Sequence, residues 1–114
     1  MSLFEITQAE RAGWQYRAAR ELAAILDAHR DLPVIGWSIG SAGAVVVGQV
    51  PGLAPRAQVR HVFDLWRAAL MLTEHSECTF ASGTTYLRAQ DSRGRVRVTL
   101  TATVPALADG QMAW

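Results

Sequence analysis

The chain has 114 residues, of which 50% are hydrophobic and 18% charged, and its formal net charge is +1. This length and composition are typical of one globular domain with its own core, and not of a disordered chain. The small net charge gives no global reason to bind nucleic acid or a membrane. We expect one domain over residues 1–114, with an N-terminal arm at 1–6 and a C-terminal tail at 105–114.

The cysteine content and the N-terminus bear on the compartment. Cys78 is the only cysteine, which excludes an internal disulfide and a cysteine-based metal cluster. The first ten residues lack the basic and apolar regions of a signal peptide, and the longest apolar stretch, 42–50, is far shorter than a membrane span. We expect a cytoplasmic protein with no membrane contact, no metal and no cofactor.

All eleven basic residues are arginine, and neither lysine nor asparagine occurs. Lysine and asparagine codons are AT-rich, whereas arginine and alanine codons are mostly GC-rich, so this composition indicates a high-GC genome. An arginine at a given position is therefore no evidence by itself that a planar guanidinium was needed there.

The first element is a predicted helix. Thr7 to Glu10 has the pattern of a capping box, in which the hydroxyl and the carboxylate satisfy free amides of the first turn. The helix is predicted to run from there to about His29 and to end before Pro33, which disfavours helical geometry in the residue preceding it. Its buried stripe consists of Ala18, Leu22, Ile25, Leu26 and His29, extended backward by Trp14.

Residues 34–39 and 44–50 are predicted to form two strands joined by a glycine-rich turn. A second helix is predicted over residues 55–72, with Pro55 in its first turn. Its buried face consists of Val59, Val62, Phe63, Trp66, Ala69 and Leu70. Its opposite face carries a charged row, Arg56, Arg60, Asp64 and Arg67, in which Asp64 is spaced to pair with Arg60 and Arg67.

The most regular pattern is the alternation of apolar and polar residues over 96–104, which predicts a half-buried strand paired with 84–90 in a hairpin. Residues 73–83 are a connection in which 77–80 can form a short strand. The element order α-β-β-α-β-β predicts an α/β (α+β) fold in two layers. Two helices would cover one face of a four-stranded, mainly antiparallel sheet.

A turn centred on Ser92 and Arg93 predicts the register of this hairpin. The implied pairs are Leu87–Val98 and Ala89–Val96 on the core face, and Gln90–Arg95, Arg88–Arg97 and Tyr86–Thr99 on the solvent face. The solvent face then gathers Tyr86, Arg88, Arg95 and Arg97. Like charges directly opposite each other are unfavourable, so an anion would relieve them.

Three interpretations of this basic face remain open. Acidic groups of a protein partner would satisfy the arginines, and so would the phosphates of a nucleic acid, with Tyr86 stacking on a base. A solvated face whose arginines reflect only codon usage explains the same pattern.

No catalytic or metal-binding motif is complete. The glycines at 36, 40 and 43 are not followed by the helix that a dinucleotide site requires, and a Walker loop needs a lysine. His75 to Cys78 matches the start of a deaminase signature whose second part is missing. The three histidines, His29, His61 and His75, lack metal-ligand spacing. A site built from His61, His75, Glu77 and Cys78 requires that they meet in the fold. We expect a protein that is not an enzyme.

Leu65 and Leu72 fall off the main stripe of the second helix, and the positions of Trp14 and Trp114 are less constrained than those of Trp37 and Trp66. Exposed tryptophan is a common interface anchor, so these residues favour self-association, as a homodimer, although they can also pack along helix edges. The expected function is a small non-catalytic interaction module that binds itself or a protein partner. The alternative is a nucleic-acid-binding module that uses Tyr86, Arg88, Arg95 and Arg97.

Four stretches of the chain carry a resemblance to other proteins: LP-x-x-x-W from Leu32 to Trp37, V-F-x-x-W from Val62 to Trp66, SGTTYLRA and VRVTLTATV. In these stretches the chain resembles small proteins of Streptomyces-type actinobacteria and of their phages and integrative elements. The resemblance covers roughly residues 22–104. It implies an origin on a mobile element, and it brings no activity or ligand with it.

Overall fold

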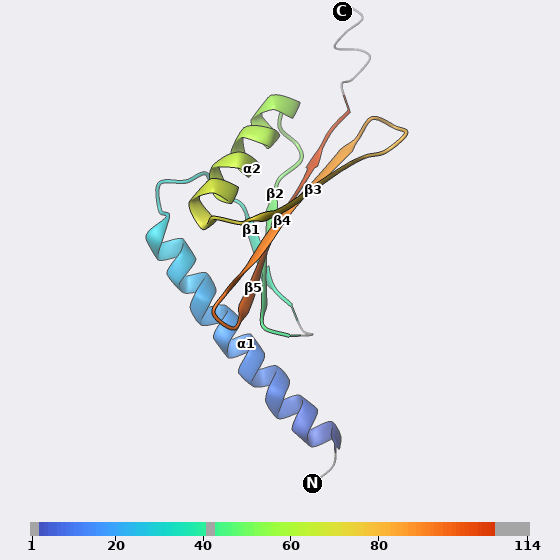
Figure 1. Ribbon diagram of the computed structural model, residues 1–114. Coiled ribbons are helices and arrows are strands. Elements are labelled where there is room, and N and C mark those ends of the chain that lie inside the picture. Colours follow the sequence, from blue (N-terminus) through green and yellow to red (C-terminus); the bar gives the residue numbers. More distant parts are fainter. Residues whose placement is uncertain (1–2, 41–42, 107–114) are drawn as a thin grey trace, which may run out of the picture.

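The computed structural model describes residues 3–40 and 43–106, which form two helices and five strands (Figure 1). The elements are α1 Leu3–Ala28, β1 Gly36–Ile39, β2 Val45–Val50, α2 Arg56–Leu70, β3 Glu74–Thr79, β4 Thr85–Arg93 and β5 Val96–Val104. The strands form one sheet in the order β1-β2-β5-β4-β3. Its buried apolar side chains lie on the one face that contacts the helices, so the predicted mixed α/β class is confirmed.

The sheet differs from the prediction in strand number and in one pairing. It has five strands, and β2 pairs with β5 in parallel, while the other three pairs are antiparallel. The additional strand is β3, whose six residues are all exposed. Its sequence EHSECT has no apolar alternation, because the strand is held by backbone bonds to β4 and not by burial of a face. Periodicity therefore could not reveal its full length.

Helix α1 begins at Leu3, so the expected arm at 1–6 is helical from Leu3 onward, and the capping-box pattern at Thr7 lies inside the helix. At about 1.5 Å per residue its 26 residues span about 39 Å, and Figure 1 shows its N-terminal part running past the end of the sheet. Ala18 and Ile25 are buried, as predicted. The prediction was wrong for Leu26, which is 45% exposed because the sheet contacts only one narrow side of this helix.

Helix α2 packs across the centre of the sheet, mainly on β5. Its buried residues are Val59, Phe63, Trp66 and Leu70, all of them predicted. The helix ends earlier than expected, because Met71 adopts a left-handed conformation (φ 53°). The Met71 and Leu72 amides donate to carbonyls of the last turn, which is a Schellman cap. Trp66 lies at the centre of the core, edge-on to Trp37 at 5.3 Å between ring centroids.

The β4–β5 register is shifted by four residues from the predicted one. Arg93 pairs with Val96, and the turn consists of Gly94 and Arg95 alone. Gly94 has φ +64°, the backbone geometry that the first position of a two-residue type II′ hairpin turn requires. The shift is an even number of residues, so each residue that remains paired keeps its predicted face although its partner changes, whereas Arg95 moves into the turn.

Candidate functional site

The helices leave one face of the sheet uncovered, which we call the open face. It carries Val45, Val47, Tyr86, Arg88, Arg97 and Thr101, together with smaller polar residues. Three of the four residues predicted for a basic face, Tyr86, Arg88 and Arg97, lie here. Arg95 lies in the hairpin turn, beyond the last strand pair.

The observed register separates the arginines that were predicted to be opposite each other. Arg88 pairs with Thr101, and Arg97 pairs with Ser92 near the hairpin tip. The guanidinium of Arg88 donates to Gln90 at 3.1 Å, whose amide donates to the Glu74 carboxylate at 2.6 Å. The predicted repulsion between opposed arginines was therefore wrong, and one arginine is already linked to a carboxylate through a glutamine.

Of the residues predicted for self-association, the structure describes Trp14, Leu65 and Leu72. Leu72 is 3% exposed and belongs to the core, because the cap of α2 turns it inward, so this prediction was wrong. Trp14 on α1 and Leu65 on α2 are half-buried. Trp114 lies outside the described residues. A role of Trp14 and Leu65 in self-association stays a prediction.

The four side chains of the hypothetical catalytic set are not brought together. Strand alternation places His75 and Glu77 on the helix-covered face of β3 and Cys78 on the open face. His61 is exposed on α2, and His75 lies against the ring of Phe63, with 6.0 Å between centroids. Within residues 3–40 and 43–106 no group of three His, Cys, Asp or Glu side chains is placed to hold a metal ion.

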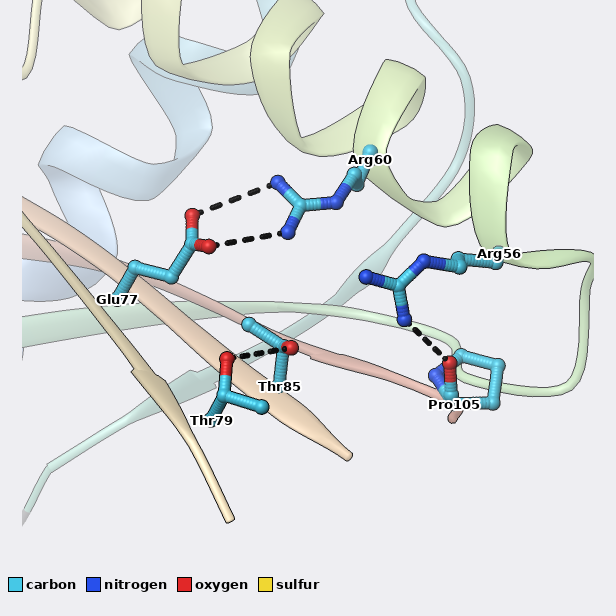
Figure 2. Close-up of polar contacts among 6 residues, drawn as sticks. All are labelled: Arg56, Arg60, Glu77, Thr79, Thr85 and Pro105. Atoms are coloured by element: carbon cyan, nitrogen blue, oxygen red, sulfur yellow. Dashed lines mark hydrogen bonds and ion pairs between the residues drawn. The ribbon is translucent and has the colours of Figure 1, made fainter. Parts of the chain in front are cut away.

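Strand β3 forms one edge of the sheet and is held to α2 by a bidentate ion pair (Figure 2). The two terminal nitrogens of Arg60 lie 3.4 and 3.1 Å from the carboxylate oxygens of Glu77. This hydrogen bond lowers the pKa of Glu77 below its ordinary value of 4.5. Arg60 was predicted to pair with Asp64, but the carboxylate it binds is that of Glu77 on β3, a segment for which the sequence indicated no more than a short strand at 77–80.

The backbone of β3 leaves three residues facing outward. The Phe80 amide donates to the Thr84 carbonyl at 2.8 Å, so Phe80 and Thr84 form a hydrogen-bonded pair. Such pairs recur at every second residue of an antiparallel ladder, so residues 74, 76 and 78 also direct their N–H and C=O groups toward β4. His75, Glu77 and Thr79 therefore direct their N–H and C=O groups away from the sheet. An edge of this kind is a template for another strand unless proline, a bulge or charge blocks it.

A second distinctive region lies where α1 meets the tip of the β4–β5 hairpin. The Arg93 Nε donates to the Glu21 carboxylate at 3.0 Å. Two hollows share this ion pair. One, of about 480 Å³, is lined by Glu21, Leu70, Met71, Asp91, Ser92, Arg93 and Gly94. The other, of about 420 Å³, is lined by Arg17, Arg20, Glu21, Arg93, Gly94, Arg95 and Val96, and we call it the arginine hollow.

The first hollow contains a carboxylate held by hydroxyl and amide donors. The Thr73 hydroxyl donates to Asp91 at 2.8 Å, and the Ser92 amide donates to its other oxygen at 2.7 Å. The Thr73 bond is the main reason that the pKa of Asp91 lies below its ordinary value of 3.8, and the Ser92 bond adds to it. A depressed carboxyl pKa contributes stability that is present above the unfolded pKa and is lost as pH falls through the folded pKa.

Replacing Thr73 by Val is therefore expected to raise the Asp91 pKa toward 3.8, because the hydroxyl donor is lost while the shape of the side chain is kept. An NMR titration of the Asp91 carboxyl carbon measures this pKa. Thr103→Val, on the open face, is the matched control and should leave the Asp91 pKa unchanged. An Asp91 pKa that did not move in Thr73→Val would contradict the assigned cause.

The sequence did not predict the arginine hollow, to which α1 contributes Arg17 and Arg20. The two lie three residues apart on α1, and Arg93 and Arg95 flank the glycine of the hairpin turn. Each pair is a visible local signal. The sequence does not show that the two pairs lie together, because residues about 75 positions apart come together only through the packing of α1 on the sheet.

Comparisons with known proteins found no matching family model, no matching curated protein and no matching solved structure. Within the described part of the chain, neither helix has the length and apolar character needed to cross a membrane.

Proposed function

We propose that this protein is a small non-catalytic interaction module that forms a homodimer by antiparallel pairing of strand β3 with β3 of a second copy. The observation that supports this proposal best is the edge of β3, which has six exposed residues and contains no proline. The opposite edge, β1, has only four residues. Phe80 directly follows β3, is 55% exposed, and adds apolar area to the same edge.

The charges of β3 select one register for such a pair. A two-fold axis perpendicular to the sheet would relate the two strands, so each residue would face one that lies an even number of positions away in the sequence. The central residues of β3 are Ser76 and Glu77, and the axis can pass through either of them. An axis at Glu77 sets two carboxylates against each other, which is unfavourable. An axis at Ser76 sets His75 opposite the partner's Glu77 twice, and Glu74 opposite the partner's Cys78. The outward-facing His75 and Glu77 would then exchange backbone hydrogen bonds in this register.

A cysteine cross-link tests both the pairing and its register. At Ser76 the two copies would form a non-hydrogen-bonded pair with Cα atoms about 4.5 Å apart. This separation lies within the range of about 4.4–6.8 Å that a disulfide accepts. Ser76→Cys, made together with Cys78→Ser, should form a covalent dimer under mild oxidation.

Ser82→Cys in the same Cys78→Ser background is the control, because Ser82 is exposed in the turn after β3 and lies off the predicted axis. It should remain uncross-linked. Equal cross-linking of both variants, or none of Ser76→Cys, would overturn the proposed register.

The proline variant His75→Pro tests the pairing without a new thiol. The His75 amide faces outward, so proline removes a donor to the partner and leaves the β3–β4 ladder intact. The matched control is His75→Ala, which loses the same imidazole but keeps the amide. Light scattering should show a dimer for the wild type, a weakened dimer for His75→Ala, and a monomer for His75→Pro. A wild-type monomer at high protein concentration would contradict the proposal.

A further inference from the structure

The positive charge of this protein is concentrated in the arginine hollow. Four arginines and one glutamate line it, which gives a formal charge of +3, whereas the whole chain carries +1. Only Arg93 among the four is paired with a carboxylate within the described residues. Codon usage can explain why these residues are arginine, but it does not explain why they come from two distant segments to one place.

We propose that the arginine hollow binds successive phosphate groups of a nucleic-acid strand. Guanidinium groups bind phosphate oxygens in a bidentate way and keep their charge at every physiological pH. Four like charges around one hollow repel each other, and bound phosphates would remove this repulsion.

A nucleic-acid strand fits the lining of the arginine hollow better than a single small phosphate compound does. Apart from the arginines and Glu21, the lining offers only Gly94 and Val96, so it has no uncharged polar side chain to recognise a base or a sugar. Tyr16 lies beside the hollow on α1 and is 65% exposed, with the Arg20 guanidinium 5.9 Å from its ring centroid. An exposed aromatic ring next to arginines is the combination on which bases of a single strand stack.

This site differs from the open face of the sheet and does not depend on the proposed dimer. Strand β3 ends its pairing with β4 at Gln90, before the hairpin tip that carries Arg93 and Arg95. The binding should therefore persist in His75→Pro, so a failure of the dimer and a failure of this site are distinguishable.

Fluorescence anisotropy with a single-stranded DNA oligonucleotide of about 16 nucleotides, enough to fill one binding module, tests the proposal. The wild type should bind at low salt, with an affinity that falls as salt rises. The triple variant Arg17→Gln, Arg20→Gln, Arg95→Gln should bind at least about tenfold more weakly, because three charge-assisted contacts are lost. Its slope of log affinity against log salt should fall by roughly 2, at about 0.7 for each lost phosphate contact.

The double variant Arg88→Gln, Arg97→Gln is the control, because it removes the arginines of the open face and leaves the hollow intact. It should bind like the wild type. Equal weakening by both variants, or no binding by the wild type at low salt, would overturn the assignment.

Three further ligands define the chemistry. Inorganic phosphate and a nucleoside triphosphate should bind more weakly than the oligonucleotide, and so should polyglutamate of similar length. If the nucleoside triphosphate bound as tightly as the oligonucleotide, the ligand of the hollow would be a small phosphate compound and not a nucleic-acid strand. If polyglutamate bound as tightly, the hollow would accept any polyanion. Either result overturns the proposal as stated.

A variant with the opposite expected effect completes the test. Glu21→Gln removes the one carboxylate of the hollow and frees Arg93 from its ion pair. It should tighten binding of the oligonucleotide, provided that circular dichroism shows the fold to be kept. A folded Glu21→Gln variant with weaker binding would count against phosphate contacts in this hollow.

Discussion

Trp66→Ala is expected to lower the free energy of unfolding by about 3–5 kcal/mol, because it removes a large buried side chain and leaves a cavity. Trp66 is 2% exposed and packs edge-on against Trp37 and His29. Its indole N–H donates to the Pro33 carbonyl at 2.8 Å, which ties α2 to the connection between α1 and β1. Urea unfolding followed by circular dichroism measures the change.

Trp66→Phe separates the hydrogen bond from the packing. Phenylalanine keeps an aromatic ring in the core but leaves the Pro33 carbonyl without its donor. The expected loss is smaller, about 1–3 kcal/mol, the cost of an unsatisfied buried group. Equal losses for Trp66→Phe and Trp66→Ala would show that the hydrogen bond, and not the packing, dominates. A loss below about 1 kcal/mol for Trp66→Ala would contradict the central place of this residue in the core.

Gly48→Ala is expected to cost about 1–3 kcal/mol, because the core has no room for one more carbon atom. A Cβ on Gly48 would lie 2.7 Å from Cζ3 and 2.9 Å from Cη2 of Trp37, and 3.1 Å from Cδ1 of Ile35. Gly48 faces the helices between these side chains on strand β2, so the indole of Trp37 occupies the space that another residue would fill. The free energy of unfolding in urea measures the effect.

Two variants control this experiment. Gly13→Ala makes the same change in α1, where the nearest atom to the new Cβ is the Arg17 side chain at 3.6 Å. It should stabilise the protein by about 0.5–1 kcal/mol, because glycine is unfavourable inside a helix. Trp37→Leu in the Gly48→Ala background should make the Gly48→Ala change less costly, since the clashing ring is gone. Additive losses in that double variant would show that the two sites are not in contact.

Several features of the fold could be predicted because each depends on local pattern. The 3.6-residue spacing of Phe63, Trp66 and Leu70 indicated which side of α2 is buried. The period-two alternation of β5 indicated its covered face, and this face survived an error of four residues in register. The register itself was wrong because Ser92 and Arg93 look like turn residues, whereas the turn that forms has Gly94 at positive φ.

Two features of the sheet were decided only when distant segments packed together. The parallel pairing of β2 with β5 depends on where the chain returns after α2, β3 and β4. Strand β3 has a polar sequence, and it is a strand because β4 offers it a backbone ladder.

The sequence by itself determined the two helices, the β1–β2 and β4–β5 hairpins, and the buried faces of α2 and of the β4–β5 hairpin, because side-chain periodicity acts over a few residues. Only the tertiary structure decided which charges are neighbours. Arg60 binds Glu77 and not Asp64, and Arg93 meets Glu21 of α1. Electrostatic contacts depend on distances across the fold, and nothing local in the sequence encodes those distances.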